Sequence, residues 1–341
     1  KPPSGVAGVE IHPKIKEVGL RMSSMEIVGS NARAEAVLVT FSKVIADYTA
    51  PPLTDISRNL TQYVTTQINF LVYQRPMCIG MGNAIRWLKL QIGKIQPGVN
   101  DEEAKGKLVD MISEYVQERI TAAGAYIAEA GAYKIQDGDV ILTYGASSTV
   151  ERLLLDAKHK LKRRFRVIVI DPRPQSEGRD LGRGRNGMNG GVTYAPVTAL
   201  SFVMREASKV FLGAEAFFAN GAMLSRAGTA MVALAAHSYH VPVIAACETY
   251  KFSERIQLDA VVSNELDTPD ALIFKTGIPD AQPVGPKSDS TLDWRSTPNL
   301  RLLNLTQDIT PSVFVTMIIT EVGMIPTTSI PVVLREYKNQ N

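Results

Sequence analysis

Cysteine and histidine are scarce in this chain, which holds two cysteines and four histidines among 341 residues. Cys78 and Cys247 both stand in apolar surroundings, so a reducing compartment is expected and a disulfide framework is not. His237 and His240 are three positions apart, but no carboxylate or cysteine follows closely, and we expect both at the surface. The sequence therefore predicts neither a metal nor a cofactor.

An excess of either charge is lacking too, since 37 Lys and Arg stand against 34 Asp and Glu, for a net charge of +3. Neither nucleic acid nor an anionic membrane is therefore the expected partner. No apolar run approaches the roughly 18 residues of a membrane span. The first residues carry no signal peptide and no initiating Met, so we expect a fragment of a cytosolic protein.

After a short tail at 1–10, residues 11–131 are predicted to form an all-helical domain. Apolar side chains recur there at steps of three and four, and Ala50-Pro51-Pro52 breaks the first run. Asn100 is a candidate helix cap with Glu103 three positions on. It precedes the strongest stripe, formed by Leu108, Met111, Ile112, Tyr115, Val116, Ile120, Ala123, Tyr126 and Ile127.

From 132 to 341 the period changes, and short apolar runs alternate with helical stretches such as 222–239. This alternation predicts a Rossmann-like, mostly parallel sheet with helices on both faces. The expected strands lie at 140–143, 167–170, 192–196, 209–212, 241–246 and 300–305. A helix is expected at 311–322, and the segment 273–299, rich in Pro, Gly, Asp and Ser, is expected to be a surface loop.

Polar residues follow the expected strands, and parallel sheets bind ligands at that edge. Serine hydroxyls at a helix start, with arginines nearby, are compatible with a phosphate site. Its candidate residues are Ser147, Ser148, Arg173, Arg179 and Arg226. In the alternative interpretation the serines only cap the helix, and the arginines pair with Asp171, Glu177 or Glu215.

Two further motifs carry less weight. The segment 182–187 matches G-x-G-x-x-G, but it does not directly join a strand to a helix, so a loop is expected. The basic run 158–166 is a candidate nucleic-acid patch, yet it falls at a helix end, where cations satisfy the last carbonyl groups.

Several segments resemble the regulatory subunits of eukaryotic translation initiation factor 2B, and they are spread along almost the whole chain. They are GSNARAEAVL (29–38), DYTAPP (47–52), ACETYKF (246–252), SNELDTPD (263–270) and PVVLREY (331–337). The resemblance implies a regulatory, non-catalytic subunit of the guanine nucleotide exchange factor for initiation factor 2. It also implies a role in the translational response to stress, by sensing phosphorylation of the alpha subunit of initiation factor 2.

The same resemblance implies partners: the alpha, beta, gamma and epsilon subunits of the complex, with beta closest, and initiation factor 2 itself. The stretches 260–266 and 314–319 are the expected pairing segments, which places Asn264 and Glu265 among the partner-binding candidates. Recognition of the phosphorylated subunit is expected on the helical half, with Arg21, Arg33, Arg75 and Arg86 as candidates. Ordinary solvated side chains, and core packing for the apolar stretches, are the alternatives.

The fold is shared, as the resemblance implies, by sugar-phosphate isomerases of the methylthioribose-1-phosphate type, and such an isomerase is the alternative function. Their catalytic cysteine stands where this chain has Gly145, and their catalytic aspartate corresponds to Glu215. Glycine has no side chain to react, and one extra methylene misplaces a carboxylate by roughly 1.5 Å. We therefore expect no catalytic residues.

Overall fold

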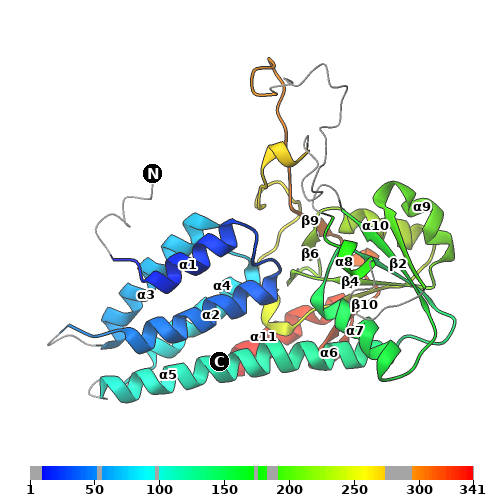
Figure 1. Ribbon diagram of the computed structural model, residues 1–341. Coiled ribbons are helices and arrows are strands. Elements are labelled where there is room, and N and C mark those ends of the chain that lie inside the picture. The colour runs from blue at the N-terminus through cyan, green and yellow to red at the C-terminus, as the bar shows by residue number, and fades with distance from the viewer. Residues whose placement is uncertain are drawn as a thin grey trace. The chain divides into compact units, whose positions relative to one another are not determined.

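The computed structural model describes residues 10–51, 56–96, 100–172, 176–182, 191–272 and 294–340 (Figure 1). The chain divides into two compact units. The helical unit comprises 1–124, 248–253 and 334–341, and the α/β unit comprises 125–247 and 254–333. The predicted boundary after residue 131 lies seven residues beyond Gly124, where the first stretch of the helical unit ends. The sequence did not predict that 248–253 and 334–341 return to this unit. Among the described residues, no helix is long and apolar enough to cross a membrane.

The helical unit follows the predicted succession of helices. They are α1 (Pro13–Ser23), α2 (Ser30–Asp47), α3 (Ile56–Gln74), α4 (Ile79–Gly93) and α5 (Asp101–Tyr115), which continues through a π-helical stretch (Val116–Ala122) into α6 (Ala123–Ala132). Asn100 caps α5 as predicted, because its Oδ1 accepts a hydrogen bond from the Glu102 amide at 3.2 Å. Glu103 pairs instead with Lys107, one helical turn on, at 2.6 Å.

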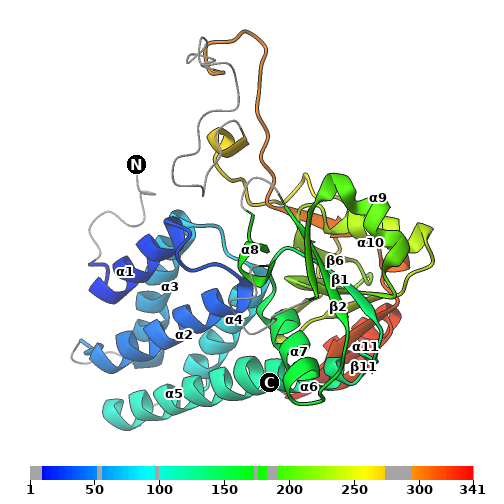
Figure 2. The same ribbon diagram turned by 45° about the vertical axis from the view of Figure 1, so that its right-hand side comes forward.

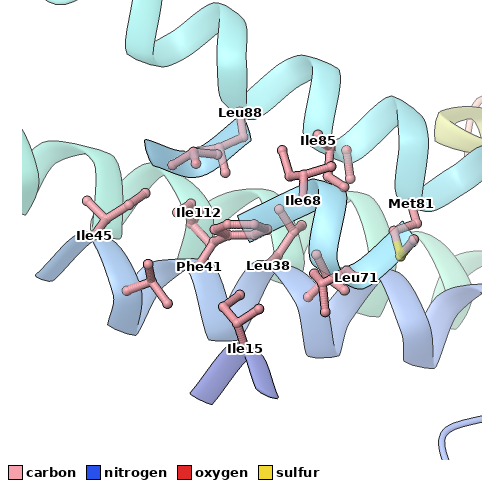
Figure 3. Close-up of a cluster of buried hydrophobic side chains, with 14 of the residues drawn as sticks. Ile15, Leu38, Phe41, Ile45, Ile68, Leu71, Met81, Ile85, Leu88 and Ile112 are labelled. Carbon is pink, nitrogen blue, oxygen red and sulfur yellow. The ribbon is translucent and has the colours of Figure 1, made fainter. Parts of the chain in front are cut away.

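The core of this unit lies where the apolar faces of its helices meet (Figure 3). Phe41 and Leu38 of α2 are fully buried there, together with Ile15 of α1. Ile112 of the predicted stripe packs into the same cluster, whereas Tyr126 is half exposed. A π-helical stretch changes the number of residues per turn, so the buried face shifts between α5 and α6.

The returning segment 248–253 completes this core. It forms a single 3₁₀ turn (Thr249–Lys251) followed by the short strand β8 (Phe252–Ser253). Tyr250 is fully buried in the cluster, with its ring edge-on to Tyr115 at a centroid distance of 6.5 Å. A Cβ at Gly80 would lie 3.0 Å from the Tyr250 ring, so helix α4 approaches this ring closely because position 80 is glycine.

The α/β unit confirms the predicted fold class. Its main sheet contains β1 (Val140–Tyr144), β2 (Arg166–Asp171), β3 (Val192–Pro196), β4 (Lys209–Gly213), β7 (Val243–Ala246), β10 (Met317–Thr320) and β11 (Gly323–Ile325), in the order β11-β10-β7-β4-β1-β2-β3. All neighbours are parallel except the pair β10 and β11. Leu142 lies opposite Ile168 on one side and Val210 on the other.

Helices cover both faces of this sheet (Figure 2). On one face α6 and α7 (Ser148–His159) pack their apolar residues against Ile141, Phe211 and Ile319. The short α9 (Leu200–Val203) and α10 (Thr229–Ser238) lie on the other face. Two further α-helices among the described residues are α8 (Arg179–Gly182) and α11 (Ile330–Gln340).

Three secondary-structure predictions were wrong. The segment 311–322 forms a 3₁₀ turn (Ser312–Phe314) and then β10, because Ile318 and Ile319 are buried in the sheet. In the 300–305 segment, only Leu305 takes part in a bridge, with Leu266. The expected helix 222–239 begins only at Thr229, since 223–226 forms β6. This strand pairs antiparallel with β5 (Ala216–Phe218) and β9 (Gln307–Thr310), which the sequence did not reveal.

Candidate functional site

The chain reverses its direction of travel across the main sheet between β1 and β4. From β1 it runs outward through β2 and β3, and from β4 it runs the other way through β7 and β10. Loops leave in opposite directions at such a point, and a crevice opens at the carboxyl ends of the two strands. The residues that follow β1 and β4 are therefore the first to consider.

Ser147 and Gly213 approach each other at this point. Ser147 caps α7, accepting a hydrogen bond at Oγ from the Val150 amide at 3.5 Å, as the capping interpretation predicts. A Cβ built on Gly213 would lie only 2.2 Å from that Oγ. The hydroxyl group therefore packs directly against the backbone of β4.

Gly145 occupies the position that directly follows β1. Its φ is +62°, a left-handed conformation that costs any residue with a Cβ, and its amide donates to the Ile170 carbonyl at 2.8 Å. It is buried, and it carries no group that can act as nucleophile, acid or base. Glu215, half-buried, starts the β5–β6 hairpin with its amide bonded to the Leu224 carbonyl at 2.9 Å.

The candidate arginines are not equally placed. Arg226, at the end of β6, makes a two-pronged ion pair with Glu177, with Nε 3.0 Å from Oε2 and Nη2 on Oε1. This pairing is one of those that the alternative interpretation named. Arg179 is half-buried at the start of α8, Ser148 is exposed, and Arg173 lies outside the described residues.

Two carboxylates complete this edge of the sheet. Asp171 is buried, and it accepts hydrogen bonds from the Gly178 amide at 2.6 Å and from the Tyr194 hydroxyl. Asp308 accepts hydrogen bonds from the amides of Gly228, at 2.7 Å, and Ala230, at 2.9 Å, in the first turn of α10.

Burial raises the pKa of Asp308 to about 6, although the two amides act in the opposite direction. Burial also raises the pKa of Tyr144, and the Asp308 charge adds to that shift. The Tyr144 hydroxyl donates to the Ala227 carbonyl at 2.6 Å. Sequence reasoning missed Asp308, because its partners lie about 80 residues away and no local motif marks it.

The four arginines proposed to read a phosphorylated partner separate into two groups. Arg33 and Arg75 are buried in the helical unit, where their guanidinium groups donate to backbone carbonyls, among them those of Pro76 and Ile27. Arg21 and Arg86 are exposed; Arg21 pairs with Glu26 at 2.8 Å, and Arg86 donates to the Asn83 side chain at 3.2 Å.

A second polar cluster, which sequence reasoning also missed, lies inside the helical unit. Glu248 and Lys251 pair at 2.6 Å with side chains 0% and 5% exposed. The other Glu248 oxygen accepts from the Asn31 amide group at 2.8 Å, and the Asn31 oxygen accepts from the Tyr250 hydroxyl at 2.6 Å. These bonds anchor the returning segment within the helical core.

Residues 256–266, hereafter the apolar turn, carry large apolar side chains on the surface of the α/β unit. Leu258 and Val262 are more than four-fifths exposed, and Ile256, Val261 and Leu266 more than three-fifths. The turn is nevertheless well organised. Asp259 Oδ1 accepts hydrogen bonds from two amides of the turn, at 2.8 and 3.0 Å.

The predicted partner-binding residues Asn264 and Glu265 support this turn from within. Asn264 donates to the carbonyls of Ala260 and Gln307 at 2.7 and 2.8 Å. Glu265 is buried, and its carbonyl accepts from Thr306. The apolar side chains beside these two residues, rather than the residues themselves, face solvent.

The basic run 158–166 continues from the last turn of α7 to the start of β2. Lys160 pairs with Asp156 at 2.8 Å and Arg166 with Glu206 at 2.9 Å. The other motif, at 182–187, lies almost entirely outside the described residues, as do most of the 273–299 loop and the tail 1–10. His237 contacts the Phe314 ring at a centroid distance of 5.2 Å.

The chain thus has the class of fold in which a helical N-terminal region is followed by a mostly parallel α/β sheet. The model of one family, the Initiation factor 2 subunit family, matches residues 26–327, and the chain belongs to this family. The resemblance inferred from the sequence is thereby confirmed.

Within the family, the chain is similar to delta subunits of translation initiation factor eIF2B. It is 44% identical to that of Schizosaccharomyces pombe over 96% of this chain and 69% of the relative, and 43% identical to that of Dictyostelium discoideum over 97% and 52%. The chain thus spans about half to two-thirds of these relatives. A ribose 1,5-bisphosphate isomerase of Pyrococcus furiosus is more distant, at 29% identity over 94% of this chain and 92% of the relative.

The solved tetrameric eIF2B-beta2-delta2 complex from C. thermophilum contains a similar chain. Its TM-score is 0.80 at 35% identity, over 92% of this chain and 93% of that one.

Proposed function

We propose that the chain is a non-catalytic regulatory subunit of the cytosolic guanine nucleotide exchange factor for translation initiation factor 2. As part of that complex it promotes the exchange of GDP for GTP and senses phosphorylation of the initiation factor 2 alpha subunit. The observation that carries the proposal is the similarity to delta subunits along almost the whole chain. Co-purification with the alpha, beta, gamma and epsilon subunits in stoichiometric amounts tests it, and recovery of the chain alone would contradict it.

The proposal implies that the chain does not catalyse the isomerisation of a sugar phosphate. Gly145 follows β1 with no side chain, and a left-handed φ of +62° disfavours any replacement that has one. Glu215 carries its carboxylate one methylene further out than the aspartate of the related enzymes. Under this proposal, the edge of the sheet keeps the isomerase scaffold that the resemblance implies, without the nucleophile.

An isomerase remains the second candidate because the Pyrococcus furiosus enzyme is similar over nearly its full length. The purified chain is expected to leave methylthioribose 1-phosphate and ribose 1,5-bisphosphate unchanged. Turnover above a heat-killed control, lost in Glu215→Ala, would establish the enzyme and overturn the regulatory proposal.

The apolar turn is the proposed pairing surface for a homologous subunit, the beta subunit first. Exposed apolar side chains clustered on an ordered surface are typical of protein interfaces. The turn is held by its own hydrogen bonds, so little conformational entropy is lost when a partner covers it. The other expected pairing stretch, 314–319, contributes less surface, since Ile318 and Ile319 already pack in the sheet.

A double substitution tests this surface. Val261→Asp with Val262→Asp places two charges on the turn and is expected to abolish co-purification with beta while the melting temperature of the chain stays unchanged. Val313→Asp is the matched control, because Val313 is 71% exposed on another part of the α/β unit. Undiminished pairing of the double variant would place the interface elsewhere.

Recognition of the phosphorylated partner is proposed for the helical unit, with Arg21 and Arg86 as its accessible cations. Arg33 and Arg75 serve backbone carbonyls inside the unit, so their contribution is to hold its shape. Charge reversal of Arg21 and Arg86 in the assembled complex is expected to reduce discrimination between phosphorylated and unphosphorylated initiation factor 2, more strongly at low salt. If only reversal of the 158–166 run removes discrimination, the recognition surface lies on the α/β unit.

A further inference from the structure

Three groups that favour anions lie at the carboxyl edge of the main sheet, and a carboxylate of the chain occupies each of them. Glu177 fills the guanidinium fork of Arg226. Asp308 accepts hydrogen bonds from the amides of Gly228 and Ala230 at the start of α10. Asp171 accepts the amide of Gly178 in the loop after β2. Helix N-termini and arginine forks are the groups that phosphate usually takes.

We propose that Glu177 is an internal ligand, which occupies the place that Arg226 would otherwise offer to a phosphate group and so keeps the site closed in the wild-type chain. The Arg226 guanidinium group then has an anionic partner even when no phosphate compound is present. This narrows the predicted phosphate site: Arg226 is its receptor, and it becomes available only when Glu177 is removed. The inference concerns the chain itself and does not depend on its assembly with other subunits.

The geometry of the pair supports this role. A two-pronged arginine–carboxylate contact is a strong form of hydrogen-bonded ion pair, and both side chains are only partly exposed, at 26% and 18%. Because Glu177 is part of the same chain, a free phosphate competes with a group that is always present near the arginine. Asp171 and Asp308, whose charges act on Tyr144 together with those of this pair, add negative charge to this edge of the sheet, which disfavours an incoming phosphate.

The backbone around Arg226 is held in position independently of Glu177. The Thr229 hydroxyl donates to the Arg226 carbonyl at 2.6 Å, and the hydroxyl of Ser225 donates to the Gly213 carbonyl at 2.7 Å. The next carbonyl, of Ala227, accepts from Tyr144. Removal of the Glu177 carboxylate therefore leaves the Arg226 backbone in place at the edge of the sheet and makes its guanidinium group available to another anion.

Inorganic phosphate is the probe for this proposal, added at about 10 mM against sodium chloride of matched ionic strength. Glu177→Gln keeps the size of the side chain, and Glu177→Ala removes it. In both variants phosphate is expected to raise the melting temperature by at least about 2 °C, since a ligand that binds only the folded state stabilises it. Wild type is expected to show no rise.

Two controls separate a specific site from a general effect of salt. Glu206→Gln breaks another arginine–glutamate pair, with Arg166 at 2.9 Å, and is expected to behave like wild type. Arg226→Ala in the Glu177→Ala background is expected to lose the rise. Equal stabilisation of wild type by phosphate, or no rise in either folded Glu177 variant, would overturn the proposal.

Discussion

Replacing Lys251 by methionine leaves the carboxylate of Glu248 buried without its counter-charge. The pair is 2.6 Å apart, with side chains 5% and 0% exposed, so water does not screen it. Removal of one partner of a buried pair costs about 3 to 5 kcal/mol, mainly because the other charge stays behind. We therefore expect Lys251→Met to lower the free energy of unfolding by about that amount at pH 7.

The loss depends on pH in a defined direction. In the wild type, burial acts to raise the pKa of Glu248, but Lys251 and Asn31 outweigh it and hold that pKa below its usual value of 4.5. A lowered pKa means that the stabilisation is present above pH 4.5 and is lost as the pH falls through the pKa of the folded state. Without Lys251, burial raises the pKa, so the variant regains stability as Glu248 takes up a proton. The difference between the two proteins should shrink towards pH 4.

Urea unfolding, followed by the fluorescence of Trp87, measures this effect. Trp87 lies 4.3 Å from the Tyr115 ring, between centroids, and reports on the helical unit once Trp294 is replaced by phenylalanine in every variant. Lys107→Met, which breaks an exposed pair with Glu103, is the matched control and should leave the midpoint unchanged. The double variant Glu248→Gln with Lys251→Met should recover much of the loss. A loss below about 1 kcal/mol, or one equal at pH 4 and pH 7, refutes the reasoning.

Two further changes test the α/β unit and the role of backbone conformation. Gly228→Ala is expected to lower the free energy of unfolding by more than about 2 kcal/mol, because φ is +101° and the new Cβ would lie 2.1 Å from the Tyr144 hydroxyl. Gly106→Ala, in open space on α5, should instead raise it by about 0.5 to 1 kcal/mol. Urea midpoints compare the two variants, and equal effects would argue against the close approach at Gly228. The pKa of Asp308 is raised from 3.8 to about 6, so wild-type stability should fall as the pH rises through this range. In Asp308→Asn, the fall in the free energy of unfolding between pH 4 and pH 7 should be smaller by about 2 kcal/mol. Parallel stability profiles of wild type and variant over this pH range would contradict the assignment.

The sequence was informative where a signal is local. The apolar stripe that contains Leu108 and Ile112 predicted α5, and alternating runs such as 140–143 and 167–170 predicted the parallel strands. Periodicity failed at 311–322, where β-branched residues within a short apolar run favour a strand as much as a helix. It also missed β5, β6 and β9. Strands β5 and β6 are only three and four residues long, too short for a periodic signal, and β6 pairs with β9 across about 85 positions, as in Met223 opposite Thr310.

The candidate site shows the same limit. Ser147 was identified as a cap because capping depends on residues three positions apart. The sequence named Glu177 as one of three possible partners of the arginines, and only the fold selects it for Arg226. Asp308 remained hidden because its partners lie about 80 positions away. Glu248 and Lys251 are only three positions apart, but their burial and the bond from Asn31 arise only after the chain has folded. Arg33 and Arg75 carry no sequence mark that separates a buried arginine from a solvated one.

The return of residues 248–253 to the helical unit has a consequence for synthesis on the ribosome. The unit's first 124 residues emerge early, but Tyr250, which is fully buried in its core, is added about 125 residues later. At about 5 to 20 residues per second, the nascent helices wait roughly 6 to 25 s with an open apolar surface. While the α/β strands are synthesised, the core of the helical unit stays incomplete. In this state it can misfold unless chaperones protect it. A circular permutant that begins at Glu248 would place residues 248–341 ahead of the helices and shorten the wait. Pulse proteolysis of stalled chains would detect the earlier protection.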